Sequence, residues 1–160
     1  MQPTFALSWD VKALASAMMM TEDDVIQYFT DGRRVSFVIE RRIVATHPGW
    51  ILATSEGAGF DVADPDGANW EVRSITRQGV YFTPSNQVGK GRAYDKAAFE
   101  QKLALVRGFI LADIVDFPIV NCFKVPVENV IRWHVGGRLG ANAKVSRKKF
   151  LDELAEDIRI

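Results

Sequence analysis

Apolar and polar positions in the first part of the chain follow the spacing of α-helices. Ser8 or Asp10 can cap a first helix. Thr21, which three acidic residues follow, can cap a second helix, because acids are favoured at the positive end of the helix dipole. Residues 33–45 predict a third helix, although residues 35–39 alone are also compatible with a strand. The N-terminal segment is therefore predicted to be helical.

After Trp50 the pattern changes to short apolar runs separated by turn-forming residues. The strands predicted in this part comprise residues 50–53, 59–63, 69–76 and 79–83. The pattern then predicts a helix, two strands, a short helical turn and a last helix, which comprise residues 94–107, 108–115, 119–125, 126–133 and a segment capped by Ser146. Helices and strands therefore mix along the chain and do not separate into two blocks.

This order of elements predicts an α/β (α+β) fold, with a central mixed β-sheet flanked by helices. The length of 160 residues fits a single domain, residues 1–160. Within it, residues 1–32 are expected to form a helical N-terminal segment and residues 33–160 the core.

Charge and cysteine content narrow the classes of function. The 20 basic residues balance the 20 acidic ones, which argues against nucleic-acid binding through a large net charge but leaves room for a local basic patch. The single cysteine, Cys122, cannot form an intrachain disulfide and is expected to be buried. The sequence shows no secretory signal and no apolar run of membrane-spanning length. We therefore expect an intracellular (cytoplasmic) protein with no membrane partner.

The candidate chemistry lies in residues 59–74, where a Pro-Asp-Gly turn predicts a hairpin. Asp61 is expected on its first strand, and Glu71 and Arg73 on its second. Side chains two residues apart on a strand share a face, so Glu71 and Arg73 project together while Val72 faces the core. Two carboxylates and one cation are thus expected to converge on one surface.

Such a set of side chains suits metal-assisted hydrolysis of a phosphodiester bond. Mg²⁺ prefers hard oxygen ligands, keeps several waters and needs only one or two carboxylates. The metal can polarise a phosphoryl oxygen and lower the pKa of a bound water, and a nearby cation can offset charge in the transition state. The two histidines have no partners at zinc-ligand spacing. The expected cofactor is therefore Mg²⁺.

Asp61, nine intervening residues and Glu71-Val72-Arg73 resemble the motif of the PD-(D/E)XK nuclease superfamily, to which many restriction endonucleases belong. The order of elements over residues 33–133 is also similar. The resemblance implies a restriction-endonuclease-like fold and a Mg²⁺-dependent, sequence-specific double-strand DNA endonuclease. It implies Asp61, Glu71 and Arg73 as catalytic residues, and Asp61, Glu71 and Glu40 as metal ligands. Because one site per chain cuts one strand, a homodimer on double-stranded DNA is expected.

Arg73 stands where the superfamily usually has lysine. Arginine stays protonated and presents a planar fork, so it cannot act as a general base. Three interpretations follow: an active variant with Arg73 in the lysine role, an enzyme that uses a lysine from elsewhere, such as Lys90, or an inactive DNA-binding module with a nuclease-like fold. A further alternative is a network of surface ion pairs, which would stabilise the fold little.

Two segments outside the motif carry side chains suited to DNA contact. Residues 81–92 combine glycines and cations with amides, and Asn, Gln and Arg are the side chains that read base edges. A basic region near the C-terminus, interrupted by glycines, can contact the DNA backbone or bases, but its pattern favours the solvated start of a helix. The DNA-binding candidates are Tyr81, Ser85, Asn86, Gln87, Lys90, Arg92, Arg138 and Lys144.

Overall fold

The computed structural model of the chain describes residues 2–32, 35–55, 58–84 and 94–158. The strands found there are β1 (Phe5–Ser8), β2 (Ile51–Leu52), β3 (Val62–Ala63), β4 (Asn69–Ile75), β5 (Val80–Tyr81), β6 (Gly108–Asp113), β7 (Ile119–Pro126) and β8 (Lys144–Val145). The α-helices are α1 (Val11–Met18), α2 (Glu22–Thr30), α3 (Val35–Thr46), α4 (Lys96–Leu105), α5 (Val127–Val135) and the single turn α6 (Arg147–Lys149).

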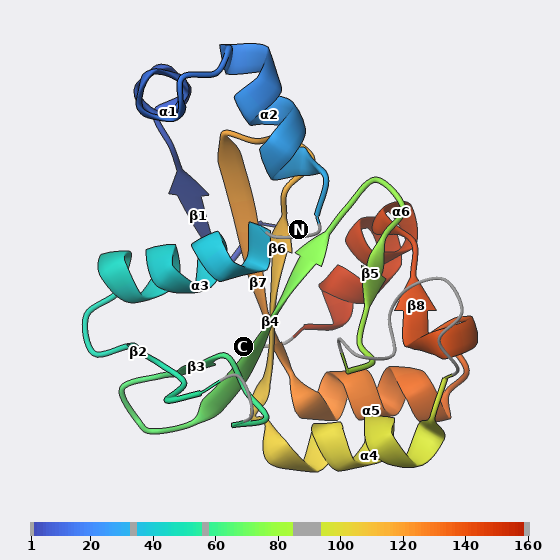
Figure 1. The fold of residues 1–160 in the computed structure, drawn as a ribbon. Coiled ribbons are helices and arrows are strands. Elements are labelled where there is room, and N and C mark those ends of the chain that lie inside the picture. The colour runs from blue at the N-terminus through green and yellow to red at the C-terminus, as the bar shows by residue number, and fades with distance from the viewer. Residues whose placement is uncertain (1, 33–34, 56–57, 85–93, 159–160) are drawn as a thin grey trace.

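A curled mixed sheet forms the centre of the molecule, with strand order β1-β7-β6-β4-β3-β2 (Figure 1). β2, β3 and β4 form an antiparallel meander, and β6, which follows α4 in the chain, runs parallel to β4. β7 and β1 extend the sheet in antiparallel fashion beyond β6. The predicted mixed sheet flanked by helices is therefore confirmed.

Helices cover both faces of the sheet, and the strands divide their side chains between two cores (Figure 1). On β6, Phe109 and Leu111 pack toward the core that α4, α5 and the C-terminal segment complete. Ile110 and Ala112 pack toward the core formed with α1, α2 and α3. Val72 on β4 belongs to this second core and is fully buried, as the alternation along the hairpin predicted.

The N-terminal helices begin at capping residues that the sequence displays. Asp10, and not Ser8, caps α1, because its side chain accepts the Ala13 backbone N–H at 2.9 Å. Thr21 caps α2 in a reciprocal capping box with Asp24. No helix in the described residues is long and apolar enough to span a membrane.

The third predicted segment is a helix and not a strand. Ile39 and Ile43 are both fully buried at the spacing of a helical face. Cys122 on β7 is also fully buried, as expected.

Three elements differ from the sequence predictions. β1 lies before the predicted helices and pairs with β7, a partner more than a hundred residues away that no local pattern reveals. β5 pairs with β8 and does not join the meander. The last helix begins at the predicted cap, Ser146, but gives way after α6 to a π-helical turn (Phe150–Leu154) and a 3-10 turn (Ala155–Asp157).

Candidate active site

The hairpin holds Asp61 directly before β3 and against β4. The Asp61 backbone N–H donates to the Trp70 carbonyl at 3.0 Å, and its Oδ2 accepts the Val72 N–H at 2.7 Å. Because both contacts reach β4, the same backbone that builds the hairpin fixes the carboxylate. Asp61 therefore lies beside the strand that carries Glu71, as the sequence predicted, one residue before the strand itself begins.

Glu71 and Arg73 form a buried ion pair on β4. Glu71 Oε1 lies 2.6 Å from Arg73 Nη2, and the two side chains are 4% and 14% exposed. Arg73 Nη2 also donates to the Thr83 carbonyl at 3.0 Å. The shared face of residues two apart is as predicted, but the pair is not a solvated surface contact. These contacts fix both side chains, so Glu71 and Arg73 belong to an ordered, buried cluster.

Lys102 completes this cluster from α4, and sequence reasoning missed it. Its Nζ contacts Glu71 Oε2 and donates to the Gly59 carbonyl at 2.7 Å, and its side chain is 12% exposed. A sequence signal for this position exists. Phe99 and Leu103 are the buried residues of α4, and a residue three after Phe99 lies on the same side of the helix. A lysine on the sheet-facing side of a helix is a candidate for a buried charge.

Glu40 approaches the cluster from α3. Its side chain is 17% exposed, and its Oε2 lies 3.8 Å from Arg41 Nη1. Burial, and next the charge of Asp61, raise the pKa of Glu40 to about 7. Arg41 opposes this shift without cancelling it. The structure therefore brings Glu40 within electrostatic reach of the hairpin carboxylates.

Burial and a neighbouring carboxylate act on Asp61 in the same way as on Glu40. Burial, and next the charge of Glu71, raise the pKa of Asp61 to about 6, although the Val72 N–H and the two cations of the cluster lower it. Two carboxylates thus bind protons more tightly than free side chains do. A site that disfavours its own negative charges in this way favours the arrival of a cation.

The donor set suits Mg²⁺ in chemistry but is not gathered as a preformed cage. Glu40, Asp61 and Glu71 offer hard carboxylate oxygens, the ligands that Mg²⁺ prefers. Both Glu71 oxygens contact cations, and one Asp61 oxygen accepts a backbone N–H. Among the residues that the structure describes, no three such side chains are close enough to ligate one metal. One or two carboxylates with retained waters is the coordination that these residues fit.

A cleft of about 1370 Å³ lies beside Arg73. It is lined by residues of α2 and the start of α3 and by residues of β4, the following turn and β5. Arg73 belongs both to the carboxylate cluster and to the wall of this cleft. The lining residues with polar or aromatic side chains include Gln27, Tyr28, Ser36, Arg77, Gln78 and Tyr81.

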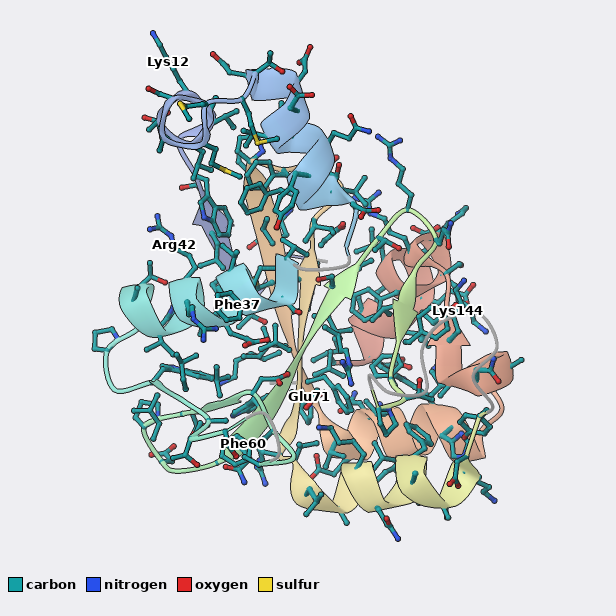
Figure 2. All side chains as sticks on the ribbon, in the orientation of Figure 1. Lys12, Phe37, Arg42, Phe60, Glu71 and Lys144 are labelled. Carbon is teal, nitrogen blue, oxygen red and sulfur yellow. The ribbon has the colours of Figure 1, made fainter. Side chains whose placement is uncertain are left out.

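The DNA-binding candidates separate into three groups. Tyr81 lines the cleft, and Lys144, opposite it in the β5–β8 register, places Nζ 4.9 Å from the Tyr81 ring centroid. Arg138 forms an ion pair with Asp157 and does not line the cleft. Five candidates lie outside the described residues: Ser85, Asn86, Gln87, Lys90 and Arg92. Figure 2 shows Glu71 on the central strands and Lys144 beyond β5.

Comparisons with protein-family models, with curated proteins and with solved structures find no match for this chain. Chemically, the cluster offers carboxylate oxygens for a hard cation together with two positive side chains, of which Arg73 lines the cleft. Carboxylates, a guanidinium group and an ammonium group in one buried site can bind a metal and an anionic ester at the same time.

Proposed function

We propose that this protein is a Mg²⁺-dependent, sequence-specific endonuclease that cuts double-stranded DNA. One observation carries the proposal. The Glu71 carboxylate meets the cations of Arg73 and Lys102 in a buried cluster beside a cleft, and the Val72 N–H holds the Asp61 carboxylate against the same strand. This is the set of groups that the resemblance to PD-(D/E)XK nucleases implies, with a lysine in an unexpected place.

The order of elements gives further support. The resemblance implies a helix with an acidic residue before the hairpin, then a helix, then later core strands. In this chain α3 with Glu40, the β2–β4 meander, α4 and the pair β6–β7 follow one another in that order. We propose a restriction-endonuclease-like fold on this basis.

Each side chain has a proposed role. Asp61 would hold the metal together with one further carboxylate, from Glu71 or Glu40. When bound, Mg²⁺ supplies a polarised phosphoryl oxygen and a water of lowered pKa. Lys102 takes the place of the usual lysine, because its ammonium group reaches Glu71 from α4. Arg73, which also lines the cleft, offsets the charge on the phosphate.

Cutting both strands requires two sites, so we propose a two-fold homodimer as the active form. The competing function is an inactive DNA-binding module. Arg73 favours it, because an arginine in the lysine position cannot take a proton from water.

A cleavage assay tests the proposal. The protein is incubated with a long duplex DNA of diverse sequence, with Mg²⁺ or with EDTA, beside Asp61→Ala and a matched control, Asp66→Ala. Asp66 is exposed in the turn of the same hairpin, so its loss leaves the cluster intact. We expect discrete fragments from the wild type and from Asp66→Ala with Mg²⁺, and none from Asp61→Ala.

The other outcomes are equally informative. Fragments that persist in Asp61→Ala would overturn the site. A smear that requires Mg²⁺ and Asp61 would replace sequence-specific cutting by nonspecific cutting. A gel shift without cleavage would favour the binding module, and neither cleavage nor binding would sink the functional proposal.

Two further variants separate the roles of the cations. Lys102→Met is expected to lower the cleavage rate by more than about 100-fold, because it removes the ammonium group while Arg73 remains beside Glu71. A rate unchanged in Lys102→Met would return the lysine role to Arg73. Cleavage gained by Arg73→Lys in an otherwise inert wild type would mark an inactivated nuclease.

A further inference from the structure

Arg77 joins two hollows on one edge of the molecule. It lines the cleft beside Arg73, and it also lines a second hollow of about 380 Å³, whose wall includes Lys148. The two hollows therefore share a single arginine. Their combined extent exceeds what one small phosphate ligand fills.

The turn that carries Arg77 is fixed by its own hydrogen bonds and by a close approach to β8. Thr76 and Gly79 exchange two backbone hydrogen bonds, of 3.1 and 2.9 Å. Gly79 has a φ of +108°, and a Cβ atom there would lie 1.9 Å from the Val145 carbonyl oxygen. Only glycine permits this contact, which brings the residues after β8 beside the β4–β5 turn. The relative position of Arg77 and Lys148 is thus set by packing.

The charges along this edge are available to a ligand. Arg77 is exposed, and no hydrogen bond or ion pair joins it to another described residue. Lys148 is 86% exposed and pairs with the exposed Asp152 four residues on, a contact that a phosphate can replace at small cost. Arg147, in contrast, already pairs with the buried Asp113 and with the exposed Asp116. The accessible cations are therefore Arg77 and Lys148.

We propose that Arg77 and Lys148, here called the basic edge, hold the sugar–phosphate backbone of one DNA strand as it leaves the candidate active site beside Arg73. This inference rests on the proposed function and adds to it the path that one DNA strand takes away from the candidate active site. Arg73 and Arg77 are four residues apart, at most about 13 Å along a strand, which is the rise of about four nucleotides. Contacts to phosphates at this spacing supply affinity without reading sequence.

Binding is measured by the fluorescence anisotropy of a labelled duplex over a series of salt concentrations, in EDTA so that no strand is cut. Arg77→Gln and Lys148→Gln each remove one phosphate contact, which lowers the slope of log K against log salt by about 0.9. This change corresponds to about eightfold weaker binding at 0.1 M salt. The double variant is expected to lower the slope by about twice as much. Lys12→Gln is the control, because Lys12 projects from α1 far from Glu71 (Figure 2).

Asp152→Asn tests the proposal through a gain of DNA binding instead of a loss. It releases Lys148 from its ion pair, so binding should tighten, whereas a purely structural role for the pair predicts no gain. An unchanged salt slope in both glutamine variants of a protein that cuts DNA would overturn the basic edge alone. A reduced slope in a protein that cuts nothing would support the basic edge and reject the nuclease function.

Discussion

Glu71 on β4 and Asp113 on β6 are both buried acids on neighbouring parallel strands, each with a side chain 4% exposed, but their charges are balanced in different ways. Arg147 Nε donates to both Asp113 oxygens, at 3.0 and 2.9 Å, and its Nη2 lies 2.9 Å from Asp116 Oδ2. The hydrogen bond to Asp113 raises the pKa of Arg147 further above its ordinary value. This cluster stabilises the charged form of Arg147.

The carboxylates around Glu71 behave in the opposite way, because their charged forms are disfavoured. Two further carboxylates, Asp61 and Glu40, have raised pKa values, mainly because burial disfavours their charged forms. A fold gains nothing from buried acids that resist ionisation, so such groups point to a ligand that repays the cost. The comparison thus separates a structural clamp at Asp113 from a site prepared for a cation at Glu71.

The largest expected effect separates the two acids by activity. Glu71→Gln should lower the rate of DNA cleavage by more than about 100-fold, because it removes a proposed ligand and the partner of both cations. Asp113→Asn should leave the rate per folded molecule near the wild-type value. Single-turnover cleavage, normalised to the folded fraction from circular dichroism, makes the measurement. Equal losses in the two variants would mean that both clusters serve only the fold.

The second expected effect is on stability, and it distinguishes the Asp113 cluster from the Glu71 cluster. Arg147→Ala leaves Asp113 buried without its cation, and should lower the free energy of unfolding by about 3 kcal/mol. Lys102→Met should cost less, because Glu71 retains Arg73. Urea unfolding at pH 7 compares the two. A larger loss in Lys102→Met would identify the Glu71 cluster as the main electrostatic support of the fold.

Local patterns were sufficient to predict much of the fold and part of the site. The cap at Thr21 and the shared face of Glu71 and Arg73 are formed by residues close in the sequence, and both appear as predicted. Lys102 was missed because its contact with Glu71 joins residues from separate elements. Only its place on the buried side of α4 could have indicated it.

The β5–β8 pair was missed for a related reason. Val80 and Val145 are far apart in the chain, and strands of two residues carry almost no pattern. The close approach at Gly79 that brings them together is visible only in three dimensions. The cleft and the basic edge depend on this approach, so the sequence predicted neither of them.

The smallest expected effect is on the free energy of unfolding that the protein loses by keeping the Glu40 carboxylate buried in the site. The folded-state pKa of Glu40 is about 7, against an ordinary value of 4.5. The folded protein therefore binds a proton that the unfolded chain releases, and stability falls as pH rises from about 4.5 through 7. Glu40→Gln should raise the free energy of unfolding by about 1–3 kcal/mol at pH 8 in EDTA. At pH 4.5 both proteins carry a neutral side chain there, so the gain should vanish.

Glu128→Gln is the matched control, because Glu128 is an exposed acid on α5, outside the cluster. Urea unfolding of the three proteins at both pH values gives the comparison. The stabilised Glu40→Gln variant should also cut DNA more slowly than the wild type, since the buried carboxylate that costs stability is a proposed metal ligand. A variant that is more stable and equally active would remove Glu40 from the metal site, whereas a loss of stability at pH 8 would show that its charge supports the fold.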